Sequence, residues 1–154
     1  MISKQDLVGS WQLESWTIGY SDRDEFSYPF GENPQGLLMY SDDGWMSAAL
    51  NRADRGRFPD DTSPRAMPEA ARAEAYGSYF HYSGRFRIVG GDVIHYVTQS
   101  LNPNFPGTEQ LRHAELDGHT LVLSGKDQAG DVTRFHSLVW HRVPAEEEHF
   151  IIDA

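Results

Sequence analysis

The residues best suited to chemistry are concentrated in two segments, 93–101 and 108–116. Both alternate apolar and polar residues with a period of two, which predicts β-strands. A symmetric hairpin would place Val97 opposite Arg112 and His95 opposite Ala114. One face of that hairpin then carries Val93, His95, Val97, Gln99, Leu101, Thr108, Gln110, Arg112, Ala114 and Leu116.

A cationic side chain on an apolar face needs a partner, because burying an unpaired charge is costly. Arg112 would therefore meet a carboxylate, or an anionic or carbonyl-bearing ligand, and it could stabilise a developing oxyanion. Histidine is the residue type that exchanges protons near neutral pH, which suits His95 to acid–base chemistry. Alternatively, Arg112 pairs with Glu14 or Glu32, and His95 is an ordinary core residue. A register shift of one residue would expose both.

The segment 133–143 is a further predicted strand, with His136, Leu138 and Trp140 on one face. His136 either joins His95 inside the molecule or lies exposed. Two histidines with Tyr40 would suit acid–base work. The catalytic candidates are His95, Arg112 and Tyr40. The predicted ligand-binding residues are Met39, Met46, Phe86, Val97, Gln99, Gln110, His136 and Trp140.

Other chemistries lack their sequence signatures. The chain has no cysteine, which removes disulfides, thiolate zinc sites and cysteine nucleophiles. The seven histidines show no His-x-His or His-Glu-x-x-His spacing, so we expect no metal site. No serine lies in a nucleophile elbow, and Gly90-Gly91 is typical of a hairpin turn rather than a phosphate loop. We therefore expect no cofactor.

Composition and charge describe one globular domain. The 154 residues are 39% hydrophobic and carry a formal net charge of −10, which disfavours nucleic acid and anionic membranes as partners. No segment has the pattern of a signal peptide or a membrane span, so we expect a cytoplasmic protein. We expect a single domain over residues 1–154, with its core at 6–143 and an acidic tail at 144–154, as a monomer or homodimer.

Short segments of strand character, bounded by turn residues, recur along the chain. The predicted strands are 9–20, 36–41, 45–50, 82–89, 93–101, 108–116, 119–124 and 133–143, and 21–35 is predicted to be a loop. A helix is predicted from Pro68 to about Phe80, because Pro and an acid suit a first helical turn. Ala73, Tyr76 and Phe80 would form a stripe that docks on the rest of the molecule.

The turn at Asp42-Asp43-Gly44 predicts a hairpin between 36–41 and 45–50. With Tyr40 opposite Trp45, Met39 pairs with Met46 and Leu37 pairs with Ala48. One face would then be wholly apolar: Leu37, Met39, Met46, Ala48 and Leu50.

Eight antiparallel strands with one helix after the third predict an all-β fold, an up-and-down barrel, with a sandwich as the alternative. A closed barrel of eight strands has room for one small ligand.

An ordered set of short motifs resembles the lipocalin-like domain family, which comprises calycin-type eight-stranded barrels of bacteria and fungi. The motifs are Leu7-Val-Gly-Ser-Trp11, Pro29-Phe-Gly-Glu-Asn-Pro34, Gly36-Leu-Leu-Met-Tyr40, Gly44-Trp-Met-Ser-Ala48, Tyr82-Ser-Gly-Arg85, His95-Tyr-Val97, Pro106-Gly-Thr-Glu-Gln-Leu-Arg112, Glu115-Leu-Asp-Gly118 and Leu138-Val-Trp-His-Arg142. The resemblance covers about residues 6–143. It implies a barrel with a ligand inside, and an indole of Trp11 that closes one end beneath Arg142.

Two functions from different classes are compatible with these features. The first is a protein that binds a small, largely apolar molecule inside the barrel. The second is a cofactor-independent isomerase, cyclase or lyase that acts on a small hydrophobic, polyketide- or terpenoid-like substrate in the same cavity. The polar residues on the apolar face favour the enzyme, and the absence of a recognised catalytic spacing favours the binding protein.

Overall fold

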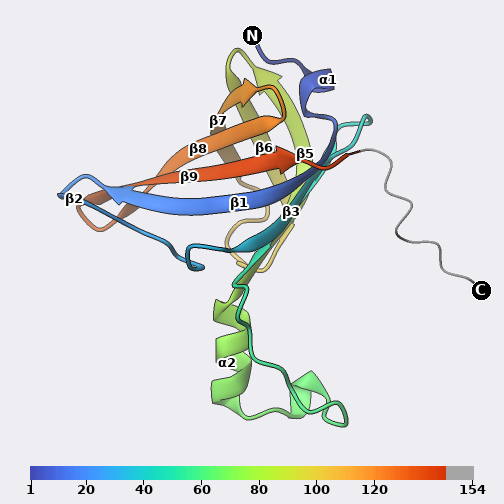
Figure 1. Ribbon diagram of the computed structural model, residues 1–154, viewed down its shortest axis with the longest axis vertical. Coiled ribbons are helices and arrows are strands. Elements are labelled where there is room, and N and C mark those ends of the chain that lie inside the picture. The colour runs from blue at the N-terminus through green and yellow to red at the C-terminus, as the bar shows by residue number, and fades with distance from the viewer. Residues whose placement is uncertain (145–154) are drawn as a thin grey trace, which may run out of the picture.

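The computed structural model describes residues 1–144 of the chain, so the predicted acidic tail lies almost wholly outside the described residues. Eight strands form a closed antiparallel barrel in the order β1-β3-β4-β5-β6-β7-β8-β9, and β9 pairs back onto β1 (Figure 1). They are β1 (Gly9–Tyr20), β3 (Gln35–Tyr40), β4 (Trp45–Asn51), β5 (Tyr79–Val89), β6 (Asp92–Ser100), β7 (Glu109–Asp117), β8 (Thr120–Ala129) and β9 (Val132–Arg142). The predicted up-and-down barrel is confirmed.

Three short elements were not predicted. The additional strand β2 (Arg23–Ser27) lies in the segment predicted to be a loop, where its polar, exposed residues show no alternation. It pairs with the far end of β1, beyond the part of β1 that pairs with β3. The helix α1 (Lys4–Leu7) is held by a capping box between Ser3 and Asp6. The third element is a 3-10 turn, η1 (Pro64–Ala66).

Trp11 closes one end of the barrel, as the family resemblance implied. Its side chain is fully buried, and its Nε1 donates a hydrogen bond of 2.9 Å to the carbonyl of Leu7. The guanidinium carbon of Arg142 lies 4.1 Å from the centre of the indole, and its nitrogens donate to the carbonyls of Asp6 and Val8. Gly9 has a φ of 129°, and a Cβ there would lie 2.9 Å from Arg142 Nη1. The Gly-x-Trp motif therefore needs glycine at this position, because other residues rarely adopt this φ and any side chain would collide with Arg142.

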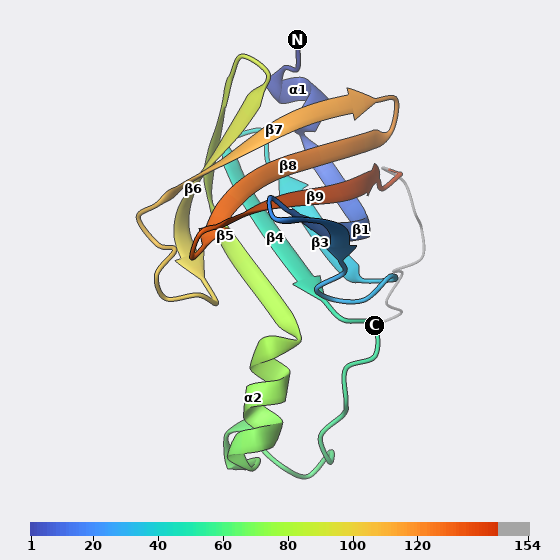
Figure 2. The ribbon, with the colours of Figure 1, turned by 90° about the vertical axis from the view of Figure 1, so that its left-hand side faces the viewer.

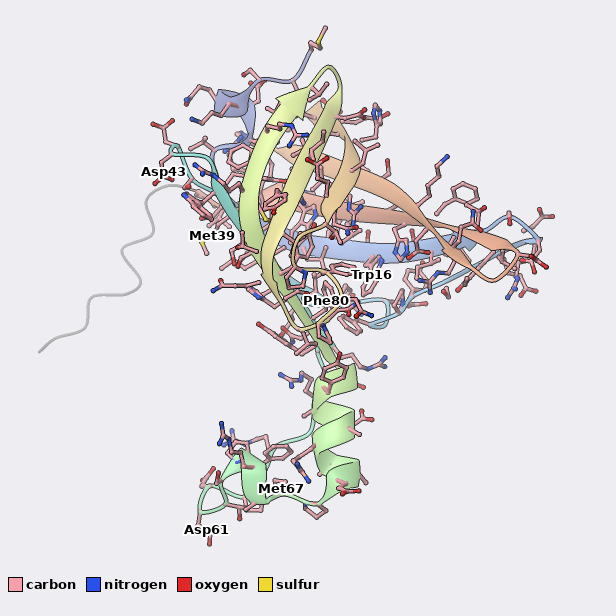
Figure 3. The ribbon with its side chains drawn as sticks, turned by 180° about the vertical axis from the view of Figure 1, so that it is seen from behind. Trp16, Met39, Asp43, Asp61, Met67 and Phe80 are labelled. Carbon is pink, nitrogen blue, oxygen red and sulfur yellow. The ribbon has the colours of Figure 1, made fainter. Side chains whose placement is uncertain are left out.

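The hairpin of β3 and β4 differs from its prediction by one residue. Tyr40 pairs with Met46 rather than with Trp45, because five residues, 41–45, lie between the paired positions and Ser41 N donates a hydrogen bond to Trp45 O across the turn. A shift of one residue turns alternate side chains over. Leu37 and Met39 therefore point outward, with Met39 43% exposed, and Figure 3 shows Met39 on the outside of the barrel.

The hairpin of β6 and β7 is shifted by four residues from the predicted register, with His95 opposite Gln110 and Val93 opposite Arg112. An even shift keeps the same side chains on the inner face. An extra residue in β6, Thr98, lies opposite the step from Ser83 to Gly84 of β5, and this bulge breaks the alternation of β6 near its end. Gln99 therefore lies exposed, where it accepts a hydrogen bond from Ser83 Oγ, and its predicted place on the inner face is wrong.

The helix α2 (Glu69–Gly77) projects away from the barrel together with the loop before it (Figures 1 and 2). None of its residues is buried, and Tyr76 is 55% exposed, so the predicted docking stripe is wrong. Its alanines offer little apolar area to bury. Phe80 instead belongs to β5 and packs edge-on against Phe105, with 5.6 Å between the ring centres. Within residues 1–144, no helix has the length and apolarity needed to cross a membrane.

Replacing Trp11 by Ala is expected to lower the free energy of unfolding by about 3–5 kcal/mol, because a large buried aromatic is lost and a cavity remains. Urea denaturation measures this difference. Trp45 is the matched control, since it is 44% exposed on the outer face and only stacks on Arg85. Trp45→Ala should cost less than about 1 kcal/mol. Equal losses for the two variants would contradict the role of Trp11 in closing the barrel.

Candidate functional site

The barrel contains a cavity of about 520 Å³, which is within the usual range for ligand pockets. On β1 its wall is made by Trp16 and Ile18, further along the strand than Trp11, so the cavity lies toward the other end of the barrel. Most of the wall is apolar. The apolar side chains are Trp16, Ile18, Leu38, Ala48, Leu50, Phe80, Phe105, Leu123, Leu138 and Trp140. Figure 3 shows Trp16 and Phe80 on this side of the molecule.

His95 lies in the wall of the cavity between two tyrosines. Its Nε2 is 2.7 Å from the hydroxyl of Tyr40, and its Nδ1 is 2.6 Å from the hydroxyl of Tyr82. Burial, aided by the charge of Arg112, lowers the pKa of His95 to about 3. Burial also raises the pKa of both tyrosines. All three side chains are therefore neutral near pH 7, whereas the residue type of His95 had suggested proton exchange in that range.

The two hydrogen bonds that join Tyr40, His95 and Tyr82 both run in one direction, from Tyr40 toward Tyr82. A neutral imidazole donates from one nitrogen and accepts at the other. Tyr40 is 2% exposed and does not line the cavity, so its hydroxyl donates to His95 Nε2. The Nδ1–H of His95 then donates to the oxygen of Tyr82, which leaves the Tyr82 O–H to point into the cavity. The opposite direction would leave the buried Tyr40 O–H without an acceptor among the described residues, which is costly.

Arg112 reaches into the cavity across Gly125 of β8. A Cβ on Gly125 would lie 2.8 Å from Arg112 Nη1, so the glycine provides the space for the guanidinium. Nη1 donates to the carbonyl of Leu111 at 2.9 Å. Neither predicted carboxylate partner is used: Glu14 pairs with His141 at 3.0 Å on the surface, and Glu32 is exposed. No carboxylate among residues 1–144 lies within ion-pair distance of Arg112.

Asp127, Arg134 and His136 form a second polar group in the cavity wall. Two oxygens of Asp127 each lie 2.7 Å from Arg134 nitrogens, and one lies 3.1 Å from His136 Nε2. His136 Nδ1 accepts a hydrogen bond from Trp16 Nε1, so its proton resides on Nε2. Burial lowers the pKa of His136, although Asp127 opposes this. The charge of Asp127 is thus paired with that of Arg134.

The indole Nε1–H of Trp140 is buried and has no hydrogen-bond partner among the described residues. Trp140 lies in the cavity wall, two residues further along β9 than Leu138. An unsatisfied buried donor costs about 1–3 kcal/mol.

The predicted site residues separate into four sets. His95, Arg112, Gln110, His136 and Trp140 line the cavity. Tyr40 lies behind His95. Met46, Phe86 and Val97 pack into the core instead of lining the cavity, because Tyr40 and neighbouring rings fill that part of the barrel. Met39 and Gln99 point outward, for the reasons of register and bulge given above.

Most residues of the cavity wall were not predicted as site residues, and those among them that carry a polar atom in the side chain are Trp16, Tyr82, Lys126, Asp127 and Arg134. The alternation of segment 82–89 places Tyr82 on the same face as Phe86, which was predicted to face inward. The same alternation could therefore have identified Tyr82 as an inward-facing residue. Asp127 lies beyond the predicted strand 119–124, because β8 in fact continues to Ala129. Its pairing with Arg134 follows from the β8–β9 register.

A hollow of about 580 Å³ lies outside the barrel at the end that Trp11 closes, beside Val8, His119 and Arg142. The guanidinium of Arg142 is already engaged by Trp11 and two backbone carbonyls. The hollow therefore offers little free polar chemistry, and the cavity inside the barrel is the candidate site.

Stability should report the buried, neutral state of His95. The pKa of His95 is about 3 in the folded chain against an ordinary value of 6.5, so the unfolded chain binds the proton more readily between these values. Acid therefore destabilises the fold as pH falls below about 6.5, by at most about 1.4 kcal/mol per pH unit. His95→Gln lacks this titration. Urea unfolding of both proteins should show the wild type losing about 2 kcal/mol more than the variant from pH 6 to pH 4. If the free energies of unfolding of the wild type and His95→Gln changed equally with pH, His95 would not be buried in its neutral form.

Comparison with known proteins gives one family. A family model described as a lipocalin-like domain matches residues 8–143. No curated protein matches the chain in sequence. Among solved structures, the wild-type fluorescent protein UnaG is 13% identical, with 92% of this chain and 100% of that chain covered and a TM-score of 0.39. A point mutant of UnaG gives 13% identity, 92% and 99% coverage and a TM-score of 0.38.

Proposed function

This chain belongs to the lipocalin-like domain family, and on that premise we propose that it binds one small, largely apolar molecule inside its barrel. The observation that carries the proposal is the cavity of about 520 Å³ with its mainly aliphatic and aromatic wall. A ligand pocket of this kind is mostly apolar, with a few polar groups that fix orientation. Arg112 and Tyr82 are the polar groups suited to that role here.

The surroundings of His95 favour binding over the alternative of a cofactor-independent isomerase, cyclase or lyase. A general acid or base works best when its pKa lies near the working pH. His95 has a pKa of about 3, and both of its nitrogens are already engaged by tyrosines. The carboxylate of Asp127 is held by Arg134 and His136. Neither group is therefore placed to exchange protons with an occupant.

Native mass spectrometry of freshly purified protein tests the proposal first. We expect a bound small molecule at one per chain, which is released on denaturation. A fluorescent probe gives the second measurement: N-phenyl-1-naphthylamine, an uncharged aromatic amine, should become brighter when the protein is added.

Filling the cavity should abolish the binding of this probe. Ala48 is 4% exposed and lies in the cavity wall, so Ala48→Phe is expected to weaken probe binding by about tenfold or more. Ala49→Phe is the matched control, because its neighbouring position on β4 faces outward. Circular dichroism checks that both variants are folded. Equal binding by Ala48→Phe and the wild type would contradict a site inside the barrel.

A further inference from the structure

The charge of Arg112 is not balanced by any carboxylate among the described residues. The other arginine of the cavity wall, Arg134, is paired with Asp127. Arg112 donates one of the five N–H groups of its guanidinium to the carbonyl of Leu111. The chain has an excess of acidic residues, with a net charge of −10, yet none of those described reaches Arg112.

Tyr82 adds a second donor next to this charge. Its oxygen is fixed by His95, and its O–H is directed into the cavity because Tyr40 occupies the other side of the imidazole. Tyr82 and Arg112 both line the cavity, and the charge of Arg112 acts on Tyr82. A group between them would meet N–H and O–H donors and one full positive charge.

We infer that the molecule held in the barrel is an amphipathic anion, whose acidic head group binds Arg112 and the Tyr82 O–H while its apolar body lies against Leu38, Leu50, Leu123 and Leu138. The inference rests on the proposed function, because it requires an occupied cavity. A neutral carbonyl would satisfy the hydrogen bonds but would leave the guanidinium charge uncompensated. An anion satisfies both, and charge pairing is strong where water is excluded.

Two probes with the same ring skeleton separate charge from apolar burial. The first is 1-anilinonaphthalene-8-sulfonate, and the second is N-phenyl-1-naphthylamine, which lacks the sulfonate. Fluorescence titration gives a dissociation constant for each. The wild type should bind the sulfonate at least about tenfold more tightly. Ala48→Phe should abolish the binding of both probes, which excludes adsorption to the outer surface.

Substitutions at the head-group site should remove the preference for the sulfonate. Arg112→Leu is expected to weaken sulfonate binding by about tenfold or more and to change binding of the amine by less than about twofold. Tyr82→Phe should weaken the sulfonate by a smaller factor. Arg85→Leu is the charge control, because Arg85 lies on the outer face over Trp45.

A second variant moves Arg112 without removing it. Gly125→Ala introduces a Cβ 2.8 Å from Arg112 Nη1, so the guanidinium must shift, and the preference for the sulfonate should fall. Gly19→Ala is the matched control, since a Cβ there has its nearest neighbour at 4.0 Å. Circular dichroism again confirms that each variant is folded.

Each outcome separates the two proposals. If neither probe binds the wild type, the proposed function is wrong. If the amine binds as tightly as the sulfonate, or if Arg112→Leu weakens both equally, the cavity binds apolar molecules and the inference of an anionic ligand is overturned. A loss of sulfonate binding confined to Arg112→Leu, Tyr82→Phe and Gly125→Ala supports it.

Discussion

Closing a sheet into a barrel removes the inward side chains from water, so each polar group inside must find its partner within the molecule. The structure meets this constraint with small groups drawn from different strands. His95 lies between two tyrosines, and Asp127 lies between Arg134 and His136. Arg112 and Trp140 are exceptions, because no carboxylate among the described residues pairs with the charge of Arg112 and the buried N–H of Trp140 has no partner there. Both residues lie in the wall of the candidate site.

The period-two alternation predicted most of the fold. At the site, the predicted strand registers were wrong, and a register error turns a side chain over only when it is an odd number of residues. For β6 and β7 the predicted register was wrong by four residues, which left His95 and Arg112 on the inner face. For β3 and β4 it was wrong by one, which reversed Met39. Turn length decides such a shift, and the hydrogen bonds of Ser41 that set this turn depend on the folded hairpin.

The rest of the site could not be predicted, because it depends on contacts between distant parts of the chain. Tyr40 and His95 are 55 positions apart, and Trp16 and His136 are 120 apart. The pKa of His95 follows from its burial among these neighbours and not from its residue type. The bulge that turns Gln99 outward likewise arises from the pairing of β5 with β6. Composition predicted the helix near residue 69, but not that it would extend away from the barrel.

The pairing of β1 with β9 also sets an order for folding during synthesis. β1 is made first, yet from Trp11 to Tyr20 its partner along one edge is the last strand. A ribosome adding about 5–20 residues per second takes on the order of ten seconds to reach β9. Until then the nascent sheet has unpaired edges, and such edges can pair with other chains. The delay between the first and last strands is thus the interval in which the nascent chain is most exposed to aggregation.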